Sequence, residues 1–284
     1  MSGASFNLMG WLRRIGLDGP VPPDLSGLRA VVAAQSGTIP FENVDVLLGH
    51  PPKLDIGSLQ AKMVDRRRGG YCFEQNALLG AGLTELGFKV TRLLARVIRG
   101  RAQYASAPAT HMMLRVDLAE GSFLADTGYG NQTPTAPLPL RPGEEFQTPH
   151  EMMRLVAVGG ELTLQARAPE EWQSLYRLSL EPRTDEDFEV ANWFTATHPA
   201  SPFVSNLIVA RPGPGGVRNT VFNGRVSVRR PGLSVERRIS PDAADLRSVL
   251  AAAFGLDLDA GEVARALDML DRRGTLHSTH PFFV

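Results

Sequence analysis

The first third of the chain carries apolar residues at helical spacing. Between residues 6 and 17 they recur roughly every three or four positions, and Gly19-Pro20 ends the pattern. Asp24 is suited to be a helix N-cap, and the apolar positions after it predict a second helix that ends near Gly37. Residues 39–43 contain a proline, and because the residue before proline avoids the helical region, this segment is predicted to be extended.

Two more helices are predicted before residue 88. Residues 55–65 suit a short helix. A longer helix is predicted after the pair Gly69-Gly70, because Leu79, Leu83 and Leu86 recur at helical steps. Gly87 is predicted to cap its C-terminus, since glycine tolerates the left-handed conformation common there.

From residue 88 the pattern changes to short apolar and β-branched runs separated by turn residues. These candidate strands cover residues 88–98, 111–118, 123–126, 153–158, 161–166 and 176–180. Residues 119–122 give a turn signal, and residues 134–142, with four prolines, are predicted to be a loop. Short strands spaced in this way indicate an antiparallel sheet or a small barrel.

The last third of the chain mixes both patterns. Helices are predicted over residues 185–197, 241–254 and 260–270, and strands over residues 203–210, 217–228 and 233–239. We therefore predict an α+β protein with a helical domain over residues 1–87, a strand-rich domain over residues 88–187 and a mixed domain over residues 188–284.

Composition narrows the possible partners. Of the 284 residues, 43% are hydrophobic and 21% charged, as in ordinary soluble proteins. Thirty basic and thirty acidic residues cancel, so nothing favours nucleic acid or a membrane surface as a partner. No apolar run approaches the roughly 18 residues of a membrane span, and the N-terminus lacks the apolar core of a signal peptide. We predict a cytoplasmic protein, as monomer or homodimer, that holds no metal.

The only cysteine, Cys72, stands between Gly69-Gly70 and a helical pattern. In the first turn of a helix, the partial positive charge of the N-terminus favours thiolate over thiol, and Arg68 lies nearby in the sequence. The arginine run at residues 66–68 is otherwise predicted to be a solvated surface. A lone cysteine is more often a small buried hydrophobe, so a nucleophile also requires a base and an orienting acid.

Two residues of the strand-rich part have the chemistry to complete such a set. His111 begins an apolar strand, and Asp126 closes another. Each has a commoner alternative, namely a strand-end histidine bonded to backbone and an aspartate that forms a turn. The other histidines lie in loops, at a helix end or in the tail, where His277 and His280 have no carboxylate cluster to complete a metal site.

The pairing of two strands decides whether His111 and Asp126 can meet. A simple hairpin with Glu120-Gly121 at its tip would place Asp126 opposite Arg115 instead. The set therefore requires a bulge, a different register, or strands that are not paired in this way.

The nine-residue motif Arg68-Gly69-Gly70-Tyr71-Cys72-Phe73-Glu74-Gln75-Asn76 closely resembles the signature of the arylamine N-acetyltransferases. The other matching segments are residues 39–45, Thr110-His111, and residues 126–130, 187–193 and 201–203. The chain departs from the family at Thr127 and Tyr129, where valine and phenylalanine are more frequent. The resemblance covers residues 6 to 254.

The resemblance implies an N-terminal helical bundle, a central antiparallel β-barrel and a C-terminal α/β lid, with a Cys-His-Asp core like that of cysteine proteases. It implies acetyl transfer from acetyl-coenzyme A, as co-substrate, to the nitrogen of arylamines or arylhydrazines or to the oxygen of N-arylhydroxylamines. Cys72, His111 and Asp126 would be the catalytic residues, and an acetyl-Cys72 intermediate would give ping-pong kinetics.

The resemblance also indicates where a flat aromatic substrate would bind. The residues that it implies for substrate binding are Phe41, Thr110, Tyr129 and Phe203. For the three aromatic residues the alternative is ordinary core packing, and Tyr71 and Phe73, which flank the cysteine, are predicted to be packing residues.

Two other classes of function remain open at this point. Similar residues serve papain-like and transglutaminase-like folds, so a cysteine hydrolase or amide-forming enzyme is the second hypothesis. A peptide or glutamine substrate consumed without coenzyme A would favour it. The third hypothesis is a binding module for coenzyme A or an aromatic ligand without turnover, which an inert Cys72 would support.

Overall fold

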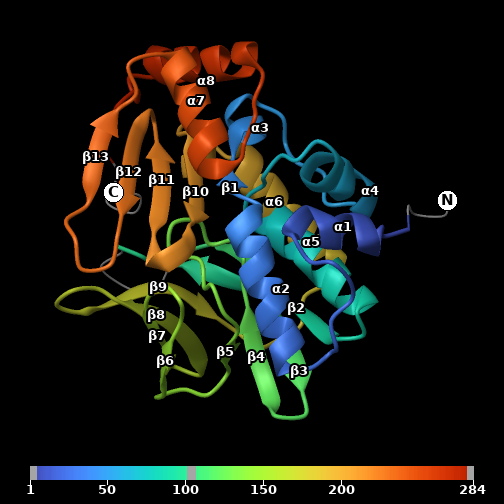
Figure 1. The fold of residues 1–284 in the computed structure, drawn as a ribbon. Coiled ribbons are helices and arrows are strands. Elements are labelled where there is room, and N and C mark those ends of the chain that lie inside the picture. The colour runs from blue at the N-terminus through green and yellow to red at the C-terminus, as the bar shows by residue number, and fades with distance from the viewer. Residues whose placement is uncertain (1–4, 101–106, 280–284) are drawn as a thin grey trace.

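A computed structural model gives the fold and describes residues 5–100 and 107–279, so His280 of the tail lies outside the described residues. Figure 1 shows helices from the first part of the chain on one side, a curled sheet below, and a second sheet backed by the last two helices. The predicted α+β class, with helical, barrel and α/β parts, is confirmed. The domain boundaries near residues 87 and 187 stay a prediction.

Helices make up most of the first part. These are α1 (Leu8–Ile15), α2 (Leu25–Thr38), α3 (Val44–Leu47), α4 (Ile56–Leu59), η1 (Gln60–Asp65) and α5 (Cys72–Glu85). The helices of the last part are α6 (Asp185–Thr197), η2 (Pro202–Val204), η3 (Pro214–Gly216), α7 (Ala243–Phe254) and α8 (Ala260–Arg272). Asp24 caps α2 by accepting a hydrogen bond from the Gly27 N–H, as predicted. The helix predicted over residues 55–65 instead changes after α4 into the π-helical turn η1.

Eight antiparallel strands form a nearly closed barrel. They are β2 (Lys89–Val97), β3 (Ala109–Leu118), β4 (Gly121–Ala125), β5 (Leu138–Pro139), β6 (Glu145–Gln147), β7 (Met152–Val158), β8 (Glu161–Arg167) and β9 (Trp172–Leu178), in the order β5-β4-β3-β2-β9-β8-β7-β6. The short strand β5 lies within the stretch predicted to be a loop, where it pairs with the end of β4. Leu93, Leu124 and Leu155 belong to the barrel core.

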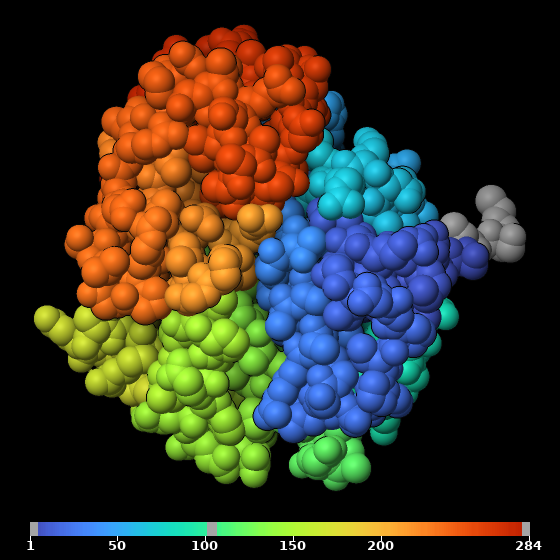
Figure 2. Space-filling model, in the orientation of Figure 1, coloured from blue at the N-terminus to red at the C-terminus, as the bar shows by residue number. Residues whose placement is uncertain are grey.

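A second antiparallel sheet combines one strand from the first part of the chain with four strands from the last part. It contains β1 (Phe41–Glu42), β10 (Ile208–Pro212), β11 (Arg218–Phe222), β12 (Arg225–Arg229) and β13 (Glu236–Ile239) in that order. Because β1 pairs with β10, with Phe41 opposite Ala210, the extended segment predicted at residues 39–43 becomes an edge strand of the C-terminal sheet. Helices α7 and α8 share a core with this sheet, and Figure 2 shows the helical, barrel and C-terminal parts meeting on one face.

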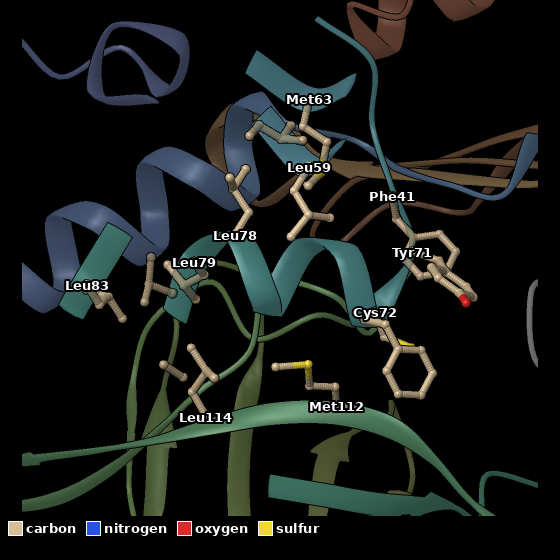
Figure 3. Packing of buried hydrophobic residues seen from close by; sticks show 14 of the residues in the cluster. Phe41, Leu59, Met63, Tyr71, Cys72, Leu78, Leu79, Leu83, Met112 and Leu114 are labelled. Carbon is tan, nitrogen blue, oxygen red and sulfur yellow. The ribbon is translucent and has the colours of Figure 1, made fainter. Parts of the chain in front are cut away.

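Helix α5 occupies the middle of the largest core. Its Leu78, Leu79 and Leu83 are fully buried, and Met112 and Leu114 of β3 pack in the same cluster. Figure 3 shows these side chains along α5 above β3, with Cys72 at the N-terminal end of the helix. This packing fixes the start of α5 against the strand that carries His111. Within the described ranges, no helix is long and apolar enough to cross a membrane.

Candidate active site

Cys72 is the first residue of α5, as predicted, and only 3% of its surface is exposed. Its Sγ lies 3.6 Å from the Thr110 carbonyl oxygen. The helix begins here because Glu74 caps it, accepting a hydrogen bond from the Tyr71 N–H at 3.1 Å. Tyr71 and Phe73 on either side are fully buried in the core, which confirms that they pack.

Arg68 does not lie on a solvated surface, so that prediction is wrong for this residue of the run. It is 8% exposed, and its guanidinium lies 3.0 Å from Glu42 Oε1 and 3.2 Å from Asp45 Oδ1. Burial lowers the pKa of Arg68, but the carboxylates of Glu42, Asp45 and Glu262 outweigh burial and raise it. Arg68 therefore stays charged, and its charge is balanced by carboxylates.

The loop after β4 reaches the start of α5 at Gly128. A Cβ atom at this position would lie 2.7 Å from Cys72 Cα and 2.8 Å from Asn76 Nδ2, which is too close for any side chain. Glycine therefore permits the contact between helix and loop. This close approach brings Asp126, two residues earlier, next to the helix.

The register of the β3–β4 hairpin places Asp126 within reach of His111. Leu118 pairs with Gly121 and Leu114 with Ala125, so the strands are shifted by two residues from the simple hairpin considered above. Extended by one residue, this register sets Asp126 opposite Met113, and His111 becomes its diagonal neighbour on the same face of the sheet. Diagonal neighbours are within reach of long and aromatic side chains. Of the three possibilities, a different register is the one found.

Four donors surround the Asp126 carboxylate, which is fully buried. His111 Nε2 lies 2.7 Å and the Tyr176 hydroxyl 2.9 Å from Oδ2. Asn76 Nδ2 donates to Oδ1 at 2.9 Å, and the Gly128 N–H donates to the same oxygen at 2.8 Å. A carboxylate offers about four lone-pair sites, so this one is satisfied as an anion.

Sequence reasoning assigned no role to Tyr176 or Asn76. Asn76 lies four residues after Cys72, and this spacing, which puts both on one face of α5, was a usable signal. Tyr176 comes from β9, which pairs with β2 across a long separation in sequence and places Tyr176 opposite Val97. Nothing local in the sequence marks it.

The charges of His111 and Asp126 support each other. Burial lowers the pKa of His111, but the Asp126 charge and hydrogen bonds to Asp126 and Cys72 outweigh it and raise that pKa to about 10. Burial raises the pKa of Asp126, but the His111 charge and hydrogen bonds from His111, Asn76 and Gly128 outweigh it and lower that pKa. The structure thus favours an imidazolium beside a carboxylate. Since Nε2 faces Asp126, Nδ1 is the ring nitrogen available to the thiol.

A cavity of about 150 Å³ opens beside the thiol. Its lining includes Cys72, His111, Phe41, Thr110, Tyr129, Phe203, Val97 and Arg99. All four predicted substrate-binding residues are thus placed in its wall. Phe41 also belongs to the core and packs against Phe203 with ring centroids 6.0 Å apart, so its packing is confirmed and its role in substrate binding stays a prediction.

A larger cleft of about 910 Å³ lies elsewhere, between α5, α6 and residues 52–56. None of Cys72, His111 and Asp126 lines it, so we assign the chemistry to the smaller cavity. Among the described residues, no group of three or more His, Cys, Asp or Glu side chains is placed to hold a metal ion.

An α+β fold in which a helix-start cysteine meets a histidine and a buried carboxylate is the arrangement expected of an acyl-transferring enzyme. Comparisons with known proteins agree. A family model described as N-acetyltransferase matches residues 24–263. An arylamine N-acetyltransferase of Mycolicibacterium smegmatis is 45% identical over 275 residues, covering 94% of this chain and 99% of that protein. An arylamine N-acetyltransferase of Escherichia coli (strain K12) is 38% identical, covering 95% of this chain and 96% of that protein.

Solved structures give the same result. The arylamine N-acetyltransferase of Mycobacterium marinum, solved in complex with CoA, superposes with a TM-score of 0.88 at 38% identity, covering 93% of this chain and 99% of that one. The chain therefore belongs to the arylamine N-acetyltransferase family. Both the resemblance and the prediction of an acyltransferase are confirmed.

Proposed function

We propose that this protein transfers an acetyl group from acetyl-coenzyme A to arylamines, arylhydrazines or N-arylhydroxylamines through an acetyl-Cys72 intermediate. The observation that carries the proposal is that Cys72 and His111 line one cavity, with His111 Nε2 held 2.7 Å from Asp126 Oδ2. Two relatives support the substrates. The Salmonella typhimurium protein, 38% identical, is named an arylamine N-acetyltransferase and N-hydroxyarylamine O-acetyltransferase, and the Mycobacterium marinum structure contains CoA.

In the first half-reaction, Cys72 attacks as thiolate. Its sulfur forms a bond to the acetyl carbonyl carbon while the bond from that carbon to the coenzyme A sulfur breaks. The imidazolium of His111 supplies the proton that the departing coenzyme A thiolate takes up. Asp126 holds the ring and stabilises its positive charge.

In the second half-reaction, the amine nitrogen attacks the acetyl carbon of acetyl-Cys72. Its proton passes to the neutral imidazole of His111, and Cys72 leaves as thiolate, which restores the starting ion pair. A covalent intermediate divides the transfer into two steps and gives ping-pong kinetics. Phe41, Tyr129 and Phe203 form aromatic walls for a flat substrate, with Thr110 close to the sulfur.

Initial-rate kinetics test the proposal. With acetyl-coenzyme A and an arylamine both varied, double-reciprocal lines should be parallel. Intersecting lines would show that both substrates must be bound together, and release of ammonia from a glutamine peptide without coenzyme A would favour the amide-forming alternative. A cytoplasmic location and a monomeric or homodimeric state remain predictions.

A further inference from the structure

The Asn76 side chain connects three parts of the site. It is fully buried, and its Nδ2 donates to Asp126 Oδ1 at 2.9 Å and to the Met112 carbonyl oxygen at 2.7 Å. Its Oδ1 accepts a hydrogen bond from the Thr127 N–H at 3.0 Å. Asn76 therefore binds the carboxylate, the backbone after that carboxylate, and the backbone of the residue after His111.

The helix sets where this amide lies relative to the thiol. Asn76 and Cys72 are four residues apart on α5, about one turn, and so lie on the same face. One face of α5 therefore carries the Cys72 sulfur and, one turn later, the Asn76 amide that binds the Asp126 carboxylate. The spacing of Cys72 and Asn76 in the nine-residue motif thereby acquires a geometric reason.

Holding Oδ1 also determines where Oδ2 points. A carboxylate is planar and rigid, so fixing one oxygen leaves the other little freedom. Asn76 and the Gly128 N–H hold Oδ1, while His111 Nε2 lies 2.7 Å from Oδ2. Without the amide, a buried carboxylate would lose one charged hydrogen bond and could turn away from the imidazole.

We propose that Asn76 is a positioning residue, which aims the Asp126 carboxylate at His111 and so keeps the Cys72 sulfur as thiolate. The inference rests on the proposed function and adds a fourth side chain to its machinery.

The test is Asn76→Leu, which keeps nearly the same size and removes every hydrogen bond of the amide. The acetylation rate of Cys72 should fall at least about tenfold, as expected for loss of one hydrogen bond to a charged group. The rate of Cys72 alkylation by iodoacetamide, followed from pH ~5 to ~9, should keep its shape but move to higher pH by about one unit.

Gln75→Met is the matched control. Gln75 is the preceding residue of α5 and equally buried, and its Nε2 donates to the carbonyl oxygens of Ile39 and Pro40 at 3.1 and 2.9 Å. Methionine has a similar shape and removes these hydrogen bonds without touching Asp126. Both variants should lower Tm, but only Asn76→Leu should move the alkylation profile.

A double variant decides whether Asn76 acts through Asp126. In an Asp126→Asn background, Asn76→Leu should change the acetylation rate less than about twofold, because the anion it aims is gone. An equal loss in both backgrounds, or an unmoved alkylation profile, would overturn the inference. Asn76→Ala replaces the leucine variant if that one does not fold. Absence of acetyl-Cys72 in the wild-type protein would instead overturn the proposed function.

Discussion

At the scale of single residues, Cys72 takes its chemistry from its surroundings. A buried, lone cysteine is usually inert, and this one is only 3% exposed. Two features distinguish it from an inert one, namely its place as the first residue of α5 and its position beside His111 in the wall of one cavity. The sequence supplied the first feature, and only the fold supplied the second.

Asp126→Asn tests the role of the carboxylate that orients His111. Asparagine keeps the shape of the side chain but removes the charge that stabilises the imidazolium, and its amide can present a donor to His111 Nε2. The same exchange in a serine-protease triad lowers kcat about 10⁴-fold. We expect the variant to fold and to lose at least about a hundredfold in the single-turnover rate of Cys72 acetylation.

Asp117→Asn is the control for this exchange. Asp117 lies next to the turn of the same hairpin, opposite Ser122, and its carboxylate accepts hydrogen bonds from Ser122 at 2.6 Å and Arg115 at 3.1 Å and none from His111. Its acetylation rate should stay within about twofold of wild type, since surface changes have small effects. Near-normal activity of Asp126→Asn, or an equal loss in Asp117→Asn, would show that the aspartate is misassigned.

The pKa of His111 predicts how stability depends on pH. That pKa, ordinarily near 6.5, is about 10 in the folded chain, because Asp126 and Cys72 outweigh the effect of burial. A histidine whose pKa is raised on folding stabilises the fold fully below its unfolded pKa, and this contribution is lost as pH rises through the folded value. The free energy of unfolding should therefore fall between pH 7 and 10, and fall less steeply in His111→Gln. Urea unfolding at several pH values measures this, and equal slopes would contradict it.

At the scale of elements, α5 and the β3–β4 hairpin each present one side of the site. The sequence predicted both, since leucine spacing marked α5 and the turn at residues 119–122 marked the hairpin. It did not predict the register. A turn of two residues between Leu118 and Gly121 moves Asp126 by two positions, and such a shift depends on turn geometry that residue type alone leaves open.

Gly128→Ala tests the contact between these two elements. The added methyl group would lie 2.7 Å from Cys72 Cα, so either the loop or the start of α5 must move. Overpacking of this kind costs about 1–3 kcal/mol of stability, and displacement of Asp126 should lower the acetylation rate at least about tenfold.

Gly37→Ala is the matched glycine control. Gly37 lies in α2, where an added Cβ would meet nothing within 4 Å. Alanine should be neutral or stabilise the protein by up to about 1 kcal/mol, because it favours helix more than glycine does. Thermal unfolding and single-turnover rates compare the two variants. Wild-type behaviour of Gly128→Ala would refute the close-approach argument.

At the scale of the whole molecule, a buried ion-pair cluster joins the helical part to α8. Arg68 bridges Glu42, Asp45 and Glu262, and Lys62 Nζ lies 2.7 Å from Asp45 Oδ2. Removing one partner of a buried pair leaves the others uncompensated. Arg68→Met should therefore cost about 3–5 kcal/mol in urea unfolding, whereas Glu262→Gln, at the half-exposed rim, should cost less than about 1 kcal/mol. Equal losses of unfolding free energy in the two variants would show that Arg68 does not stabilise the cluster more than Glu262 does.

Long-range pairing is what the sequence left undetermined. It predicted a helix at residues 185–197, ended by His198-Pro199, and the structure shows this helix as α6, capped by Thr184. It predicted an extended segment at residues 39–43, but not that β1 would join β10 nearly 170 residues away. The same limit concealed Tyr176, whose hydroxyl meets Asp126 because β9 pairs with β2, a strand far from it in the sequence. Local patterns fix local elements, whereas these contacts depend on the packing of the whole chain.

The most direct test of the account is intact-protein mass spectrometry in two steps. After incubation with acetyl-coenzyme A, the protein should gain the mass of one acetyl group, and peptide mapping should place it on Cys72. Addition of an arylamine should then return the protein to its original mass and yield the acetylated amine. Cys72→Ser should show neither change, because a serine hydroxyl stays protonated where the thiol ionises. Acetylation at any other residue, or turnover by an active preparation without an acetyl-enzyme, would contradict the account.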